Sequence, residues 1–301
     1  MDYIINRIER IQDHLPEYFH HQLRKQMFNL FMPQIHLKYN FDMTQEGGHK
    51  PTQKEFYQKY KGYEFRIFID KTENDITITI RTHETSPSDC IIIAVDLKDR
   101  NAIIHGLSHY NKCTKPFIEQ GKGGGSILLK FALGIIKVNK DIFNIDRIIL
   151  EDNAQKDCNN CDKKTRLSNL YFLMNGNTWY GKYGFRPYDK NDQISDKKRI
   201  KKYIRNQKII EDIKVKDIPL VKYMNDAIIK HNIKNIDMDI LGPKIESLGN
   251  EPLSSIIKVL MDGYNSFCCI FAHIINKIYK KLGMYQFYGE SFYVDVGDIQ
   301  L

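Results

Sequence analysis

Four short segments between residues 63 and 110 alternate apolar and polar side chains, and this alternation limits the fold more than any other feature of the sequence. The segments YEFRIFID and DITITIRTH are separated by KTEN, and CIIIAVDL and AIIHGLSHY are separated by KDRN. Apolar residues at every second position, interrupted by short polar turns, are typical of β-hairpins. The sequence therefore predicts two hairpins that form an antiparallel sheet from residue 63 onwards.

A glycine-rich turn follows these strands and leads directly into an apolar run. In EQGKGGGSILLKFALGIIK, residues 119–137, positions 121 and 123–125 are glycine. The apolar run predicts a helix from Ser126 to about Asn139, and RIILEDNA after it predicts a strand with an acidic end. Glycine lets the main chain approach a ligand closely, and the N–H groups that open a helix point at an anion. The turn therefore favours binding of a diphosphate.

Two common nucleotide-binding motifs do not fit this turn. A dinucleotide fingerprint requires a parallel βαβ unit, whereas here antiparallel hairpins precede the helix. A nucleotide P-loop ends in Gly-Lys-Ser/Thr, which this segment lacks. A diphosphate bound at this turn would therefore belong neither to a dinucleotide-binding βαβ unit nor to a nucleotide P-loop.

Three motifs together resemble the GNAT N-acetyltransferase superfamily. The segment Gln120-Gly121-Lys122-Gly123-Gly124-Gly125 matches Gln/Arg-x-x-Gly-x-Gly/Ala, the acetyl-CoA pyrophosphate loop of that family. LEDNA resembles the end of the family's fifth strand, where an Asn commonly follows, and YGKYGF resembles the Tyr-x-Lys-x-Gly-Phe that closes its fourth helix. The three motifs occur in the family order, and the resemblance covers roughly residues 63–189.

The resemblance implies an α+β fold with a mixed, mostly antiparallel sheet of the acyl-CoA N-acyltransferase type and flanking helices. We expect a helical N-terminal segment in residues 1–62 and the GNAT-like domain in residues 63–217. A mainly helical C-terminal region that ends in a strand is expected in residues 218–301. The strand over residues 105–113 should diverge from the strand over residues 147–151, which opens a slot where pantetheine pairs with main chain.

Acetyl-CoA is the co-substrate that the resemblance implies. The residues that would bind it are Gln120, Gly121, Lys122, Gly123, Gly124, Gly125 and Ser126 in and after the glycine turn, and Asn153 after the strand. Main-chain amides of the turn and of the first helical turn would hold the pyrophosphate.

The implied chemistry is direct attack of an amine on the thioester, followed by protonation of the leaving thiolate. Tyr180 matches the family position that supplies this proton, and a phenol with a reference pKa of about 10 stays protonated at neutral pH. YKKLGMYQFYGESFYVDV offers Tyr279 as a rival acid, because it also resembles the end of the family's fourth helix. A carboxylate or imidazole must accept the ammonium proton. Glu151 and His109 are the leading candidates, with His105 as a third.

We therefore expect an N-acetyltransferase that moves the acetyl group of acetyl-CoA to a primary amine of a small molecule or a protein. The alternative is a catalytically inactive module of the same fold that binds CoA or another protein within a larger assembly.

The formal net charge of +8 favours acidic partners, although the charge is carried mostly by lysine. Abundant Lys, Ile and Asn are typical of AT-rich genomes, such as those of some parasites and giant DNA viruses.

The basic run over residues 197–208 contains only Tyr203 for base stacking, so we interpret it as a solvated connection and do not expect nucleic-acid binding. KIIEDIKV at its end is expected to form one more strand.

No apolar segment is long enough for a membrane helix, and the first residues lack the features of a signal peptide. We expect a cytoplasmic protein, which includes a viral protein in the host cytoplasm or the virion. The extensive apolar faces of residues 218–301 should pack on the sheet or on a second subunit, as in a homodimer.

The six cysteines do not have the spacing of a disulfide framework, so we expect thiols in a reducing compartment. Cys158-Asn-Asn-Cys161 has the spacing of half a zinc site. No second Cys or His pair follows at a suitable distance, so no metal is expected.

Overall fold

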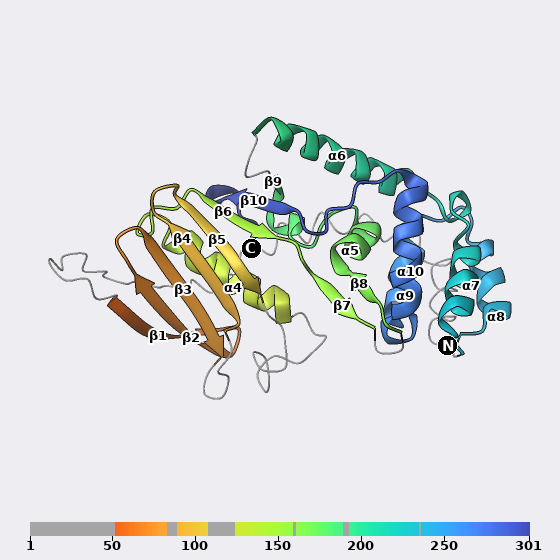
Figure 1. Ribbon diagram of the computed structural model, residues 1–301, viewed down its shortest axis with the longest axis horizontal. Helices are drawn as coiled ribbons and strands as arrows, with labels where there is room; N and C mark the ends of the chain where they lie inside the picture. Colours follow the sequence, from red (N-terminus) through yellow and green to blue (C-terminus); the bar gives the residue numbers. More distant parts are fainter. Residues whose placement is uncertain (1–51, 83–88, 108–123, 159–160, 189–192, 235) are drawn as a thin grey trace. The chain divides into compact units, whose positions relative to one another are not determined.

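A computed structural model describes residues 52–82, 89–107, 124–158, 161–188, 193–234 and 236–301 (Figure 1). These residues form two compact units. The sheet unit contains the described residues up to Glu151 together with Tyr183–Arg186 and Ser291–Leu301. The helical unit contains Asp152–Lys182 and Pro187–Glu290.

An eight-stranded mixed sheet confirms the predicted α+β class. Its order is β1-β2-β3-β4-β5-β6-β10-β9. Neighbouring strands from β1 to β5 are antiparallel, β6 is parallel to β5, and β10 is antiparallel to β6. The strands are β1 Thr52–Tyr60, β2 Tyr63–Lys71, β3 Asp75–Thr82, β4 Ile91–Asp96, β5 Asn101–Leu107, β6 Arg147–Glu151, β9 Arg186–Tyr188 and β10 Ser291–Asp295.

The two predicted hairpins are confirmed as β2–β3 and β4–β5, and β1 extends the meander by one strand. β1 begins within the segment for which we expected helix, and residues 1–51 of that segment lie outside the described part of the chain. The turn from β1 to β2 consists of Lys61 and Gly62, whose φ angles are 50° and 81°. Two consecutive positive φ values give the turn the twist that matches a tight hairpin.

The predicted helix after the glycine turn is confirmed as α4, Gly124–Val138, which packs against β5. Its apolar face is fully buried, and Phe131 stacks on Phe65 of β2 with 4.3 Å between the ring centres. Alternate residues of β3, such as Ile78 and Ile80, are also fully buried. The core of the sheet unit therefore joins the period-two face of the sheet to the helical stripe of α4.

The helical unit contains a short hairpin and the remaining α-helices among the described residues. Its longest apolar helix, α10, contacts α5, α7, α9 and strand β8, so it forms the centre of this unit. Gly263 separates α9 from α10. The elements are β7 Gln155–Asp157, β8 Lys164–Arg166, α5 Leu167–Asn175, α6 Gln193–Asp212, α7 Leu220–His231, α8 Met238–Ser247, α9 Leu253–Asp262 and α10 Tyr264–Leu282.

Two predictions for this unit are wrong. The basic run belongs to helix α6, not to a connection followed by a strand, because Tyr203, Asn206 and Ile210 form a buried stripe at helical spacing beneath the lysines. The helix that YGKYGF was expected to close ends earlier, at Asn175, because Gly176 adopts a φ of 63° and its N–H bonds to Phe172 O. A short 3₁₀ turn, η3 Gly181–Tyr183, follows.

None of the described helices has the length and apolar content that a membrane span requires.

Candidate functional site

The parallel strands β5 and β6 pair over only part of their length. Their register runs from Asn101 opposite Arg147 to Ile104 opposite Leu150, whereas β5 continues to Leu107. On its other side β5 carries an irregularity, because consecutive residues of β4 pair with Ile104 and Gly106 and leave His105 unopposed. Such a bulge bends a strand away from its neighbour. The pairing stops where β6 itself ends, at Glu151, and the expected continuation of β5 to residue 113 lies outside the described residues.

The N-terminus of α4 belongs to the same sheet unit and follows β5 in the chain. Gly124, Gly125 and Ser126 form the start of this helix, and its first turn contains no acidic residue. The first N–H groups of a helix have no partner within the helix and carry partial positive charge, so a negative ligand is favoured there. Four of the predicted loop residues, Gln120, Gly121, Lys122 and Gly123, lie outside the described part of the chain.

Two lysines add positive charge beside α4. Lys130 lies six residues after the start of the helix, which is about 9 Å along its axis. Burial lowers the pKa of Lys130, and the ammonium group of Lys61 lowers it further. Lys61 lies in the β1–β2 turn, 5.7 Å from the ring centre of Tyr60, and the Tyr60 ring lies 5.5 Å from that of Phe131 on α4. An anion would relieve the repulsion between the two ammonium groups.

Two of the candidate bases directly follow the end of the β5–β6 pairing. His105 and Glu151 are the residues that directly follow the last paired positions, Ile104 and Leu150. Both side chains are exposed. Glu151 lies opposite Ser291 of β10, so its main chain belongs to the sheet. The third candidate, His109, lies outside the described residues.

Tyr180 and Asn153 belong to the helical unit. Tyr180 follows α5 in a turn and not at the end of a helix, which corrects its expected setting. Its side chain is 8% exposed, and its ring lies edge-on to Trp179 with 4.9 Å between centres. Asn153 is exposed. The rival acid, Tyr279, lies fully buried in α10 and donates its hydroxyl proton to Asn169 O at 3.1 Å. The hydroxyl group of Tyr279 therefore makes a structural hydrogen bond.

A buried carboxyl near Tyr279 was not among the predicted site residues. Asp152 is 1% exposed, its Oδ1 accepts the Ala154 N–H at 3.3 Å, and its Oδ2 has no hydrogen-bond partner among the described residues. Burial raises the pKa of Asp152 to about 7. Burial also raises the pKa of Tyr279, and the charge of Asp152 adds to this effect, so the two groups interact. The sequence marked a strand with an acidic end, but it could not show that the second acid of LEDNA turns inward.

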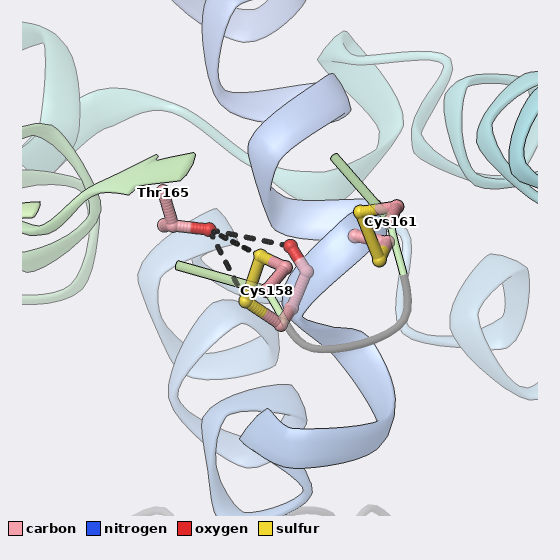
Figure 2. Close-up of a disulfide and its surroundings, with 5 residues drawn as sticks. Cys158, Cys161 and Thr165 are labelled. Atoms are coloured by element: carbon pink, nitrogen blue, oxygen red, sulfur yellow. Dashed lines mark hydrogen bonds between the residues drawn. A yellow bond between two sulfur atoms is a disulfide. The ribbon is translucent and has the colours of Figure 1, made fainter. Parts of the chain in front are cut away.

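The expectation of free thiols is wrong. Disulfides join Cys158 to Cys268 and Cys161 to Cys269, with Cα separations of 5.5 and 6.0 Å (Figure 2). Cys90 is also disulfide-bonded, and the described residues include no free cysteine. The two bridges tie the β7–β8 hairpin to α10 across 110 and 108 residues of sequence. Partners that far apart leave no local spacing to recognise, which is why the sequence did not reveal them.

No protein-family model, curated protein or solved structure matches the chain.

Proposed function

We propose that the protein is an acetyl-CoA-dependent N-acetyltransferase whose cofactor lies between the diverging ends of β5 and β6 and the start of α4. The observation that carries this proposal is the coincidence of three features in the sheet unit. The β5–β6 ladder ends at Ile104 and Leu150, α4 begins within the glycine cluster, and no acidic side chain occupies its first turn. Together they offer main-chain hydrogen bonds for pantetheine and helix-terminal amides for a diphosphate.

In the proposed reaction the amine nitrogen attacks the acyl carbon, a C–N bond forms, and the C–S bond of the thioester breaks. A base first removes a proton from the ammonium form of the acceptor, directly or through water. Glu151 and His109 are the proposed bases, and His105 shares the position beside Glu151. Tyr180 is proposed to donate its phenolic proton to the CoA thiolate, and the second proton that the attacking nitrogen loses passes through solvent to restore the tyrosine.

The acceptor in this proposal is a primary amine, either on a small molecule or on a protein. A second candidate function is binding of CoA or of a protein partner without turnover. The burial of Tyr180, which leaves only 8% of this residue exposed, favours that alternative, because a general acid must reach the sulfur of the substrate.

The first experiment combines calorimetry with a thiol-release assay. Acetyl-CoA and CoA are titrated into the full chain, and free thiol is then measured with acetyl-CoA and a panel of primary amines. Binding with amine-dependent thiol release supports the enzyme, binding alone supports the second candidate, and no binding refutes both uses of CoA. Tyr180→Phe should lower kcat while leaving CoA affinity nearly unchanged, whereas an unchanged kcat would remove Tyr180 as the acid.

A charge substitution at the start of α4 tests the proposed diphosphate site. Ser126→Asp places a carboxylate in the first turn, where it stabilises a helix but repels an anionic ligand. The isosteric Ser126→Asn is the matched control. We expect CoA affinity to fall at least tenfold for Ser126→Asp relative to Ser126→Asn, with both variants folded. Equal affinities for the two variants would place the diphosphate elsewhere.

A further inference from the structure

Four cysteine sulfurs converge where the β7–β8 hairpin meets α10. The sulfurs of Cys158, Cys161 and Cys269 lie within 4.8 Å of one another, and Cys268 is bonded directly to Cys158. Three of the four residues are buried, and Ile233 and Ala272 pack against them. Figure 2 shows the two bridges side by side between the hairpin and the helix.

The sulfur of Cys158 and both sulfurs of the Cys161–Cys269 bridge lie within 4.8 Å of one another, which is near the spacing of ligands around a single metal ion. A tetrahedral zinc site with Zn–S bonds of about 2.3 Å has sulfurs about 3.8 Å apart. From this convergence we propose that Cys158, Cys161, Cys268 and Cys269 form a thiolate site for one Zn²⁺ in the reduced chain, and that this state and the two disulfides exclude each other.

Polar groups beside the sulfurs suit a charged thiolate cluster. The Thr165 hydroxyl lies 3.5 Å from Cys158 Sγ and 3.7 Å from Cys268 Sγ, and it also contacts Cys268 O at 3.2 Å (Figure 2). Thr165 is fully buried, so its single O–H must be shared among these acceptors. Rotation of that hydroxyl toward a thiolate would supply the outer hydrogen bond that metal-bound sulfur usually accepts.

A lysine lies in the hairpin turn that carries two of the cysteines. Zn²⁺ with four thiolates carries a net charge of −2, which requires nearby cations when it is partly buried. Lys163 lies in the hairpin turn, where its N–H donates to Cys161 O at 2.7 Å. Burial lowers the pKa of His231, and the ammonium groups of Lys230 and Lys163 lower it further, so both lysines act near this ring.

Reduction of both disulfides precedes binding of the metal ion. Each disulfide takes two electrons and two protons from a dithiol reductant, which is itself oxidised to a disulfide, and yields two thiols. Four thiols then release four protons as their sulfurs bind Zn²⁺. Oxidation of the thiolates reverses the process and expels the metal. The hairpin stays attached to α10 in both states.

Cobalt binding tests the site, because Co²⁺ in tetrahedral thiolate ligation has distinctive charge-transfer and d–d absorption. The full chain is reduced anaerobically with an excess of a dithiol, freed of reductant, and titrated with CoCl₂ and then with ZnCl₂. We expect one Co²⁺ per chain with the thiolate spectrum, displacement of Co²⁺ by Zn²⁺, and protection of four cysteines from alkylation by intact-mass measurement. Metal should be released when the disulfides are re-formed with an oxidant.

Two double variants provide the matched comparison. Cys158→Ser/Cys161→Ser should weaken Co²⁺ binding at least a hundredfold, whereas Cys90→Ala/Cys113→Ala, which removes the other two cysteines, should retain it. The proposal is overturned if the reduced wild-type chain keeps its circular dichroism but shows no thiolate–Co²⁺ spectrum. It is equally overturned if reduction unfolds the chain and metal fails to restore it, or if the first double variant binds as tightly as the second.

Discussion

The buried carboxyl of Asp152 gives the helical unit a pH-dependent stability that the substitution Asp152→Asn should remove. In the folded chain burial raises the pKa of Asp152 from 3.8 to about 7. The folded state therefore holds a proton on Asp152 between about pH 4 and pH 7 that the unfolded state has already released. Because the folded state binds more protons in this window, the free energy of unfolding falls as the pH rises through it.

The size of the effect follows from the pKa difference. The difference between a pKa of 3.8 and a pKa of about 7 corresponds to about 4 kcal/mol of unfolding free energy, since each tenfold change in proton affinity is about 1.4 kcal/mol. We expect the contribution of Asp152 to be below about 1 kcal/mol at pH 4 and to approach about 4 kcal/mol of destabilisation by pH 8. Asp152→Asn keeps an oxygen for the Ala154 N–H and cannot ionise. Its stability relative to wild type should therefore rise with pH by up to this amount.

Urea denaturation from pH 4 to pH 8, followed by circular dichroism, measures this difference. The amide of Asp152→Asn has its own burial penalty, but that penalty is the same at every pH, so the slope carries the test. Asp212→Asn, an exposed site in the same unit, controls for the change in net charge and should give a flat difference. Parallel curves for wild type and Asp152→Asn would refute the reasoning, since they would mean that Asp152 is charged and solvated in the folded chain.

Two further substitutions test contacts within the individual units. Asn206→Ala should lower the free energy of unfolding by about 2–4 kcal/mol, because this buried amide pairs with both main-chain groups of Tyr285, at 2.7 and 3.1 Å, and would leave them unsatisfied. Urea denaturation measures this loss, and exposed Asn250→Ala should change stability by less than about 0.5 kcal/mol. Gly184→Ala should lower Tm by several degrees in a thermal melt, because Gly184 has a φ of 96° and a Cβ there would lie 2.8 Å from Asp298 O. An unchanged Tm would show that this turn relaxes freely.

The elements that the sequence predicted well are those whose signal is local. Alternation within nine or fewer residues identified β2 to β5, and the apolar run after the glycine turn identified α4. The continuous charge of residues 197–208 concealed helix α6, because the buried stripe of Tyr203, Asn206 and Ile210 contains a polar residue and an aromatic one. The helical spacing of these buried residues was thus hidden by the charged, solvent-exposed residues between them.

The candidate site was predictable to the same limited extent. The strand β6 and the helix at Gly124 follow from apolar runs that lie close together in the chain. The burial of Asp152 depends on contacts with Glu290 and Gly289, whose main-chain groups bond to those of Asp152 at 3.0 and 2.8 Å. The pairing of Cys158 with Cys268 likewise depends on residues over 100 positions away. Such proximity is a product of tertiary structure and has no periodic trace in the sequence.

The position of β10 determines when the sheet can be completed during synthesis. β6 and β10 are hydrogen-bonded neighbours, with Ile149 opposite Tyr293, yet the whole described helical unit and strand β9 are encoded between them. While the ribosome translates that insertion, β6 has an exposed edge that only a strand translated later can cover. A nascent chain released before residue 291 would therefore present an unpaired strand, ready to associate with a second copy of itself.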